Sequence, residues 1–220
     1  MMSILLIADS VSAGVPAGTV GMTWFELLSK GGIIMIPILL LSLFSIYLFI
    51  ERFVYIKKTT EIDKTLIDIL LSELRKTNIS QAIQYAQNDR TSTGKVLLSG
   101  LNKLGKPIQE IESHMESATN LEITKMEKNT GYLGIIAGIA PMLGFIGTIS
   151  GVIKIFYNIS LTDNLSIGII AEGLYQKMIC SGAGLIVGVV AYSCYHYLQL
   201  MIDRYSIKLQ ENLLKFLKEL

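Results

Sequence analysis

The chain has 220 residues, 51% of them hydrophobic, and its mean hydropathy of +0.51 is too high for a typical soluble domain. Its formal net charge is +1, so the composition gives no reason to expect a nucleic-acid partner. Charged residues make up 17% of the sequence and crowd into two stretches, whereas other long segments have almost none. This distribution is typical of an integral membrane protein.

Residues 1–32 precede the first long apolar run. Met1–Ala8 is apolar, and residues 12–14 (SAG) fit a signal-peptide cleavage site, but no Lys or Arg precedes the apolar stretch. We therefore favour a periplasmic N-terminus over a cleaved signal peptide. Thr23–Lys30 mixes apolar and polar residues, which predicts a short amphipathic helix on the membrane surface.

The first predicted span is Ile33–Ile50, because eighteen apolar residues form about 27 Å of helix. Pro37 falls in its first turn, where a missing N–H is tolerated. Basic residues follow the span, namely Arg52, Lys57 and Lys58, whereas only Lys30 lies shortly before it. The positive-inside rule then places the N-terminus outside and the residues from Arg52 onward in the cytoplasm.

Residues 51–131 are predicted to be a helical cytoplasmic region. Apolar residues recur at intervals of three and four in several short stripes. The first two stripes begin at Ile62 and Ile79, the second after a helix cap at Asn78. Gly105–Pro107 breaks the chain. From Ile108 a long helix is predicted, with Ile111, Met115, Ala118, Leu121 and Met126 as its apolar face, running on into the membrane as one continuous rod.

The second and third spans are predicted at residues 132–156 and 167–198, joined by a short polar periplasmic loop at 157–166. Residues 199–220 are basic and amphipathic, so the third helix should continue into the cytoplasm. The predicted fold class is an all-α integral membrane protein with three transmembrane helices. Its second and third helices are long and extend into the cytoplasm.

Glycines are dense in the second and third spans, in small-xxx-small patterns that let helices approach closely in lipid. We predict helix packing at Gly144, Gly147, Gly151, Gly184 and Gly188, with a kink at Pro141. Thr148 is the polar exception in the second span. Its hydroxyl could either bond back to a carbonyl one turn earlier or line a pore.

The third span carries polar residues in or near the hydrocarbon, and such residues suggest function. They are Glu172, Gln176, Lys177 and Ser181. Glu172 lies near the outer end, and Lys177 has a side chain long enough to reach outward. No carboxylate lies at the centre of any span. A proton path would therefore need a partner to supply a deep titrating group.

Other chemistry finds little support in the sequence. Cys180 and Cys194 are about 21 Å apart along one predicted helix, which is too far for a disulfide. His114 and His196 lack companions for a metal site. Because no nucleotide loop, metal set or clustered nucleophile and base occurs, we expect neither an enzyme nor a bound cofactor or metal.

Three segments carry a resemblance to a known family. They are KGGIIMIPILLLSLFSIYLFIER (30–52), PMLGFIGTISGVI (141–153) and GAGLIVGVVAY (182–192). In order and spacing the chain resembles the ExbB/TolQ/MotA proton-channel family, most closely its ExbB/TolQ branch. The second segment is similar to the family signature Leu-Gly-x-x-Gly-Thr-x-x-Gly.

The resemblance implies a motor subunit in the bacterial inner membrane. Family members form a ring, commonly a pentamer, around single-span helices of an ExbD/TolR-type partner whose membrane aspartate carries the proton. Proton flow then drives a TonB-like protein, and so outer-membrane transport. A TolQ-like motor for envelope constriction is the alternative within the family.

The resemblance also assigns roles within the proton path. Thr148 matches the family threonine that faces the central site, and Ser181 takes the place of a second hydroxyl residue, usually threonine. Gln176 stands where many relatives carry a pore glutamate, and an amide cannot titrate. Either Glu172 substitutes for that carboxylate or the partner's aspartate suffices.

Two other classes of function stay open from sequence alone. The same glycine packing would serve a non-conducting scaffold that only organises a partner helix. A membrane enzyme is the third class, without a supporting motif.

Overall fold

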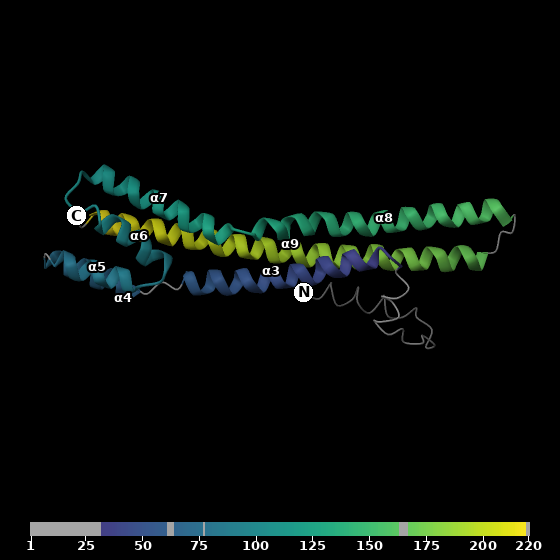
Figure 1. The fold of residues 1–220 in the computed structure, drawn as a ribbon, viewed down its shortest axis with the longest axis horizontal. Helices are drawn as coiled ribbons and strands as arrows, with labels where there is room; N and C mark the ends of the chain where they lie inside the picture. The colour runs from purple at the N-terminus through teal and green to yellow at the C-terminus, as the bar shows by residue number, and fades with distance from the viewer. Residues whose placement is uncertain (1–31, 61–63, 77, 163–166, 219–220) are drawn as a thin grey trace, which may run out of the picture.

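The computed structural model describes residues 32–60, 64–76, 78–162 and 167–218, and every regular element in these ranges is an α-helix. The helices form one elongated bundle (Figure 1). Three of them, α3, α8 and α9, are long and apolar enough to cross a membrane. The predicted all-α membrane fold with three spanning helices is therefore confirmed.

The first spanning helix, α3 (Met35–Thr59), runs well past the predicted end of the span at Ile50. Pro37 lies in its first turn, and Lys57 and Lys58 lie in its last turn, where cations favour the helix dipole. Its buried side chains form a single narrow stripe along the helix: Met35, Ile38, Ser45, Leu48, Arg52, Ile56 and Thr59. Leu41, Phe49 and Phe53 are partly buried beside this stripe, and most of the remaining apolar surface is exposed.

The helices α8 (Thr130–Thr162) and α9 (Ile167–Lys218) run antiparallel and side by side (Figure 1). A helix of 52 residues such as α9 is about 78 Å long, far more than a bilayer requires. The prediction that the third spanning helix continues well beyond the apolar segment agrees with this length. We call the end where α8 leads into α9 the hairpin end.

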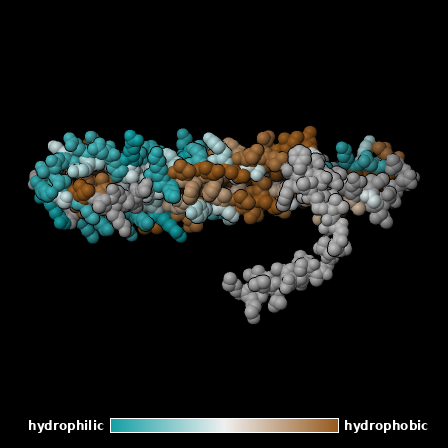
Figure 2. Space-filling view, turned by 90° about the horizontal axis from the view of Figure 1, so that it is seen from below, coloured by the Kyte–Doolittle hydropathy of each residue, from teal (hydrophilic) through white to brown (hydrophobic). Residues whose placement is uncertain are grey.

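Four shorter helices gather at the opposite end, around the last turns of α9. They are α4 (Lys64–Arg75), α5 (Ile79–Asn88), α6 (Ser92–Leu101) and α7 (Ile108–Glu127). Thr91 caps α6 by accepting a hydrogen bond from the backbone N–H of Gly94 at 3.2 Å. Apolar side chains from all four helices join one core with Phe216 of α9. Figure 2 shows that hydrophilic residues cover this end, which we call the polar end, whereas hydrophobic residues cover the middle.

The predicted continuous rod from Ile108 into the membrane is wrong. The helix α7 ends at Glu127, and α8 begins at Thr130. Between them Lys128 has an extended ψ of 131°, and Asn129 has a φ of +66°, in the left-handed region. Asparagine enters this region more readily than most residues, so Asn129 was the available signal for the break.

The predicted loop at 157–166 is also corrected in part, because residues 157–162 form the last turns of α8. In that stretch Ser160 donates a hydrogen bond to the carbonyl oxygen of Tyr157 at 2.8 Å, one turn back. Residues 163–166 and the amphipathic helix predicted at Thr23–Lys30 lie outside the described residues.

The register of α3 leaves part of the helical hairpin uncovered. Near its start, Ile34 lies 3.5 Å from the position that a Cβ would take at Gly147 of α8. Near its other end, the ring of Phe53 lies 6.2 Å from that of Tyr197 in α9. The hairpin end continues beyond the start of α3, since Thr162 is about 22 Å of helix further along α8 than Gly147.

Candidate functional site

Glycines allow the backbones of α8 and α9 to touch. A Cβ at Gly184 would lie 2.5 Å from the carbonyl oxygen of Ala140, and one at Gly188 would lie 2.5 Å from Cγ of Pro141. Real Cβ atoms do not approach other atoms so closely. We call this contact the α8–α9 seam, formed by Gly144, Gly147 and Gly151 on α8 and by Gly184 and Gly188 on α9.

In the middle of the seam Gly144 of α8 packs against the backbone of Ser181 in α9. A Cβ at Gly144 would lie 3.0 Å from both the carbonyl oxygen of Cys180 and Cα of Ser181. Thr148 follows Gly144 by four residues, so it lies one turn further along nearly the same face of α8. Thr148 and Ser181 are therefore placed along the same seam.

The hydroxyl of Thr148 donates a hydrogen bond to the carbonyl oxygen of Phe145 at 2.6 Å, within its own helix. The side chain is half-buried. This bond is the backbone interaction that the sequence allowed for Thr148. It leaves the oxygen lone pairs available to a donor from outside, since a hydroxyl both donates and accepts.

Ser181 is half-buried, and its backbone is packed against Gly144. Glu172 and Gln176 lie in α9 toward the hairpin end, but their side chains lie outside the described part of the structure. The structure therefore places Thr148 one turn along α8 from Gly144, which packs against Ser181, and it places the other two candidates one to three turns from Ser181 along α9.

Lys177 occupies the seam in a way that the sequence did not predict. Its aliphatic stem crosses α8 at Gly151, where any Cβ would overlap it. Its Nζ lies 3.9 Å from the Cβ position of Gly32, just before α3 begins. The amine thus lies level with the start of the first span, so Gly151 serves to make room for this side chain.

A family model described as the MotA/TolQ/ExbB proton channel family matches residues 88–211, more than half of the chain. The chain belongs to this family. The matched region includes α6, α7, the whole of α8 and most of α9, and so the entire seam. Family membership and three spanning helices together make the chain a multi-pass inner-membrane protein of the bacterial type.

Individual relatives carry ExbB and TolQ names. An ExbB homolog of Methanothermobacter thermautotrophicus is 26% identical over 82% of this chain and 64% of its own length. The biopolymer transport protein exbB1 of Vibrio cholerae is 27% identical over 86% of this chain and 84% of its own length. The Tol-Pal system protein TolQ of Haemophilus influenzae is 27% identical over 40% of this chain and 39% of its own length. The chain thus spans slightly less than two thirds of the first of these relatives.

In this family member the polar end holds a buried carboxylate, Glu122 of α7, which is 3% exposed. Its oxygens accept hydrogen bonds from Ser92 at 2.8 Å, Lys125 at 2.6 Å and Lys95 at 3.3 Å. Burial alone would raise the pKa of Glu122, but the hydrogen bonds from Lys125 and Ser92 and the charge of Lys95 outweigh it and lower that pKa. The cluster joins α6 to α7.

Sequence reasoning missed Glu122 because it assigned Leu121 to the buried face of α7. Leu121 is in fact 56% exposed. The buried residues of α7 repeat at intervals of three and four: Ile111, Met115, Thr119, Glu122 and Met126. Following the spacing rather than the residue type would have identified Thr119 and Glu122.

A second buried polar group, Arg52, lies where α3 meets α7. Its Nη2 donates to Glu51 Oε1 at 2.8 Å, its Nη1 approaches the carbonyl oxygen of Lys125 at 3.4 Å, and its guanidinium lies 5.4 Å from the centroid of the Tyr55 ring. Arg52 is 7% exposed, although the sequence suggested only a basic flank for the first span. It therefore connects the spanning helix to the helices of the polar end.

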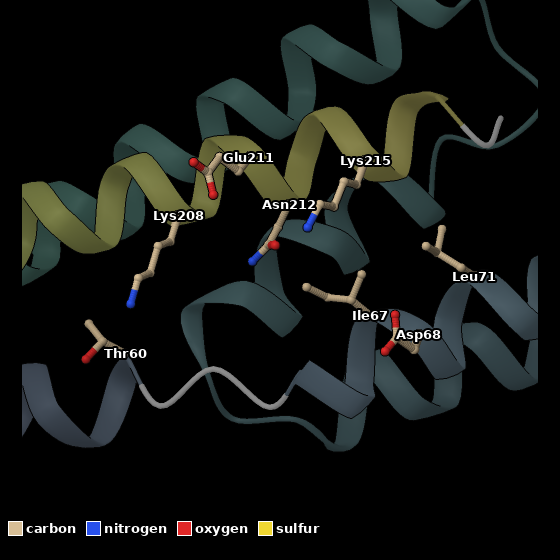
Figure 3. A pocket seen from close by; sticks show the side chains of 8 residues that line it. All are labelled: Thr60, Ile67, Asp68, Leu71, Lys208, Glu211, Asn212 and Lys215. Carbon is tan, nitrogen blue, oxygen red and sulfur yellow. The ribbon is translucent and has the colours of Figure 1, made fainter.

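A groove of about 630 Å³ opens between α4 and the last turns of α9 (Figure 3). Asp68 lines it from α4, and Lys208, Glu211 and Lys215 line it from α9. No ion pair joins these four residues in the structure as described. Charges of both signs line the groove, so it has no evident preference for anions or cations. Across the described ranges, no three His, Cys, Asp or Glu residues come together as a metal site.

Proposed function

We propose that this chain is the ring subunit of an inner-membrane proton channel that uses proton motive force to energise outer-membrane transport through a TonB-like protein. The observation that supports the proposal is the family match over residues 88–211, together with the seam in which Gly144, one turn from Thr148, packs against Ser181. A relative that spans most of the chain, exbB1 of Vibrio cholerae, is named for biopolymer transport.

The proposed orientation places the hairpin end in the periplasm and the polar end in the cytoplasm. Its support is the charge that follows the first span, where Arg52, Lys57 and Lys58 lie toward the polar end. With three spans, the N-terminus is then periplasmic and the C-terminus cytoplasmic.

In the proposed assembly, several copies, five in the usual family arrangement, surround the single-span helix of an ExbD/TolR-type partner. The partner's membrane aspartate carries the proton past Thr148 and Ser181, while Gln176 and Glu172 line the path nearer the periplasm. The hydroxyl oxygens of Thr148 and Ser181 can accept a hydrogen bond from the protonated aspartate or donate one to its ionised form. Each proton that crosses 100 mV releases about 2.3 kcal/mol, so several protons must drive one large mechanical step.

The test is proton flux in liposomes that contain the complex purified from its native membrane through a tag on this chain. We expect the double substitution Thr148→Val and Ser181→Ala to abolish flux while the complex keeps its size in gel filtration. Ser193→Ala is the matched control, because the Ser193 hydroxyl also donates to a backbone carbonyl of its own helix, that of Val189 at 2.9 Å. Wild-type flux from the double variant would overturn the assignment of the pore.

A TolQ-like motor for envelope constriction is the second candidate, supported by the match to TolQ of Haemophilus influenzae. The identity of the copurified third protein separates the two. A TonB-type protein supports the first role, and a TolA-type protein supports the second. If the complex with its partner conducts no protons, the chain is a scaffold rather than a channel.

A further inference from the structure

His196 of α9 contacts the rings of two tyrosines. The centroid of its imidazole is 4.3 Å from that of Tyr192 and 5.2 Å from that of Tyr195, with interplanar angles of 65° and 67°. Both contacts have the edge-to-face geometry that aromatic rings favour. His196 is nevertheless exposed on the surface of the single chain, so the tyrosines do not enclose its ring.

One of the two tyrosines, Tyr195, also packs against α8. The ring of Tyr195 packs over Gly134 of α8, whose Cβ position lies 3.8 Å from the ring. The Tyr195 hydroxyl accepts a hydrogen bond from Nε2 of Gln199 at 3.3 Å. Tyr195 is therefore held by its packing on α8 and by Gln199, and it offers a fixed ring edge to the imidazole.

His196 shares a helix face with the proposed pore residue Ser181. At 100° per residue, Tyr192, His196 and Gln199 all lie within about 60° of Ser181 around the axis of α9. We call these four residues the Ser181 stripe. The face that α3 covers is the opposite one, because Val190, which lines a small pocket with Ser45 of α3, is half a turn away from Ser181.

The depth of His196 is that of the polar-end boundary of the membrane. The neighbouring Tyr197 contacts Phe53, and Phe53 directly follows Arg52, the first cation after the apolar span. Along α9, His196 lies about 22 Å from Ser181. On this face the residues between Ser181 and Tyr192 are apolar, with Leu185 exposed, so the Ser181 stripe is polar at mid-membrane and again at the cytoplasmic edge in the proposed orientation.

We propose that His196 is the group that receives the proton at the cytoplasmic end of the path. A ring nitrogen takes a proton from water that reaches the end of the Ser181 stripe, and the imidazolium then gives this proton to cytoplasmic water. Histidine suits this step because it is the side-chain type whose charge ordinarily changes between about pH 5 and 8. The inference rests on the proposed function, since it requires a proton path past Ser181.

The groups around His196 are uncharged aromatic rings. The titratable groups against the ring are Tyr192 and Tyr195 of its own helix. From α3, α7 and α8, no charged group forms an ion pair with His196 in the described part of the chain. The tyrosines orient the ring, whereas the proton comes from and returns to water.

The experiment measures proton flux of the purified complex in liposomes while the pH on the cytoplasmic side is varied. In the wild type we expect flux to change through one transition between about pH 5 and 8. His196→Gln should remove this transition, and so should His196→Phe, which keeps the aromatic contacts with Tyr192 and Tyr195. His114→Gln is the matched control, because His114 is an exposed histidine of α7, and it should keep the wild-type profile.

The outcomes separate this inference from the proposed function. Loss of flux in the Thr148→Val and Ser181→Ala variant, together with loss of the pH transition in both His196 variants, supports both. If the Thr148→Val and Ser181→Ala variant loses flux but either His196 variant keeps the wild-type pH profile, the role of His196 alone is overturned. A wild-type flux that does not change with pH overturns it as well. Full flux in the Thr148→Val and Ser181→Ala variant overturns the pore itself.

Discussion

The helices of the α8–α9 seam and those of the polar end pack in opposite ways. At the seam, the contact depends on missing side chains, because Gly184 and Gly188 bring backbone atoms of one helix against the other. At the polar end, the contact depends on side chains, because Leu70, Met115 and Phe216 fill one apolar core without exposure to solvent. Each kind of packing suits its surroundings.

The physical reason is the solvent. In lipid, apolar side chains gain little by leaving the hydrocarbon, so close backbone packing must hold helices together. In water, burial of apolar surface contributes roughly 25 cal/mol per Å², so large side chains serve best. The same chain uses both because α9 passes from one environment to the other without a break.

We expect the largest loss of stability from a substitution at Gly184 of the seam. In Gly184→Ala the new Cβ meets the carbonyl oxygen of Ala140, which belongs to the backbone and cannot rotate away. We expect the loss of stability to reach about 3 kcal/mol or more, at or above the usual range for over-packing. Thermal unfolding of the detergent-solubilised protein, followed by circular dichroism, measures it.

Gly182→Ala is the matched control for that change, since no atom outside the adjoining backbone of its own helix lies within 4 Å of the Cβ position of Gly182. Both glycines lie in the same helix, so the intrinsic helical preference of alanine is common to the two variants. Equal melting temperatures for the two would contradict the close packing of the seam.

At the polar end, we expect a smaller loss of stability from a substitution at Glu122. In Glu122→Gln the amide keeps an acceptor for Ser92 but loses the charge that faces Lys125 and Lys95. We expect a loss of about 1–2 kcal/mol near neutral pH, the typical difference between a charged and a neutral hydrogen bond. Glu116→Gln, an exposed change on the same helix, should have little effect.

The pH dependence sharpens this prediction. Because the pKa of Glu122 in the folded chain lies below its ordinary value of 4.5, the carboxylate stabilises the fold at higher pH. That contribution should be lost as the pH falls below about 4.5 and passes through the lowered pKa of Glu122 in the folded chain. Urea unfolding of wild type and Glu122→Gln across this range measures it. If the free energy of unfolding changes with pH in the same way for the two proteins, the carboxylate of Glu122 contributes nothing to the pH dependence of stability.

The smallest effect is expected at Gly100 of α6. There a new Cβ would meet Cγ, the sulfur and the terminal methyl of Met115, and a methionine side chain is flexible enough to adjust. The repacking cost should be nearly offset by the helical preference of alanine, about 0.5–1 kcal/mol. We expect Gly100→Ala to unfold within a few degrees of the wild type. A loss as large as that of Gly184→Ala would erase the contrast between the two regions.

Much of the architecture was readable from the sequence. The apolar run at Ile33–Ile50, the glycine-rich spans and the short amphipathic stripes predicted the helices in their correct order. These features are local, since length, periodicity and charge act within each segment. The break at Lys128–Asn129 was missed because only one residue signals it, and the face of α7 was misjudged because Leu121 looked apolar.

The sequence by itself determined that three segments cross the membrane, that the second and third can pack closely, and that Thr148 and Ser181 are hydroxyl residues within them. Only the tertiary structure decided which atoms meet. Ser181 packs against Gly144, the Lys177 stem crosses Gly151, and the buried Glu122 accepts a hydrogen bond from Ser92. The reason is that composition fixes what a helix can bury, whereas the register between helices fixes which residues face one another. That register arises from contacts between residues far apart in the chain, which no local pattern records.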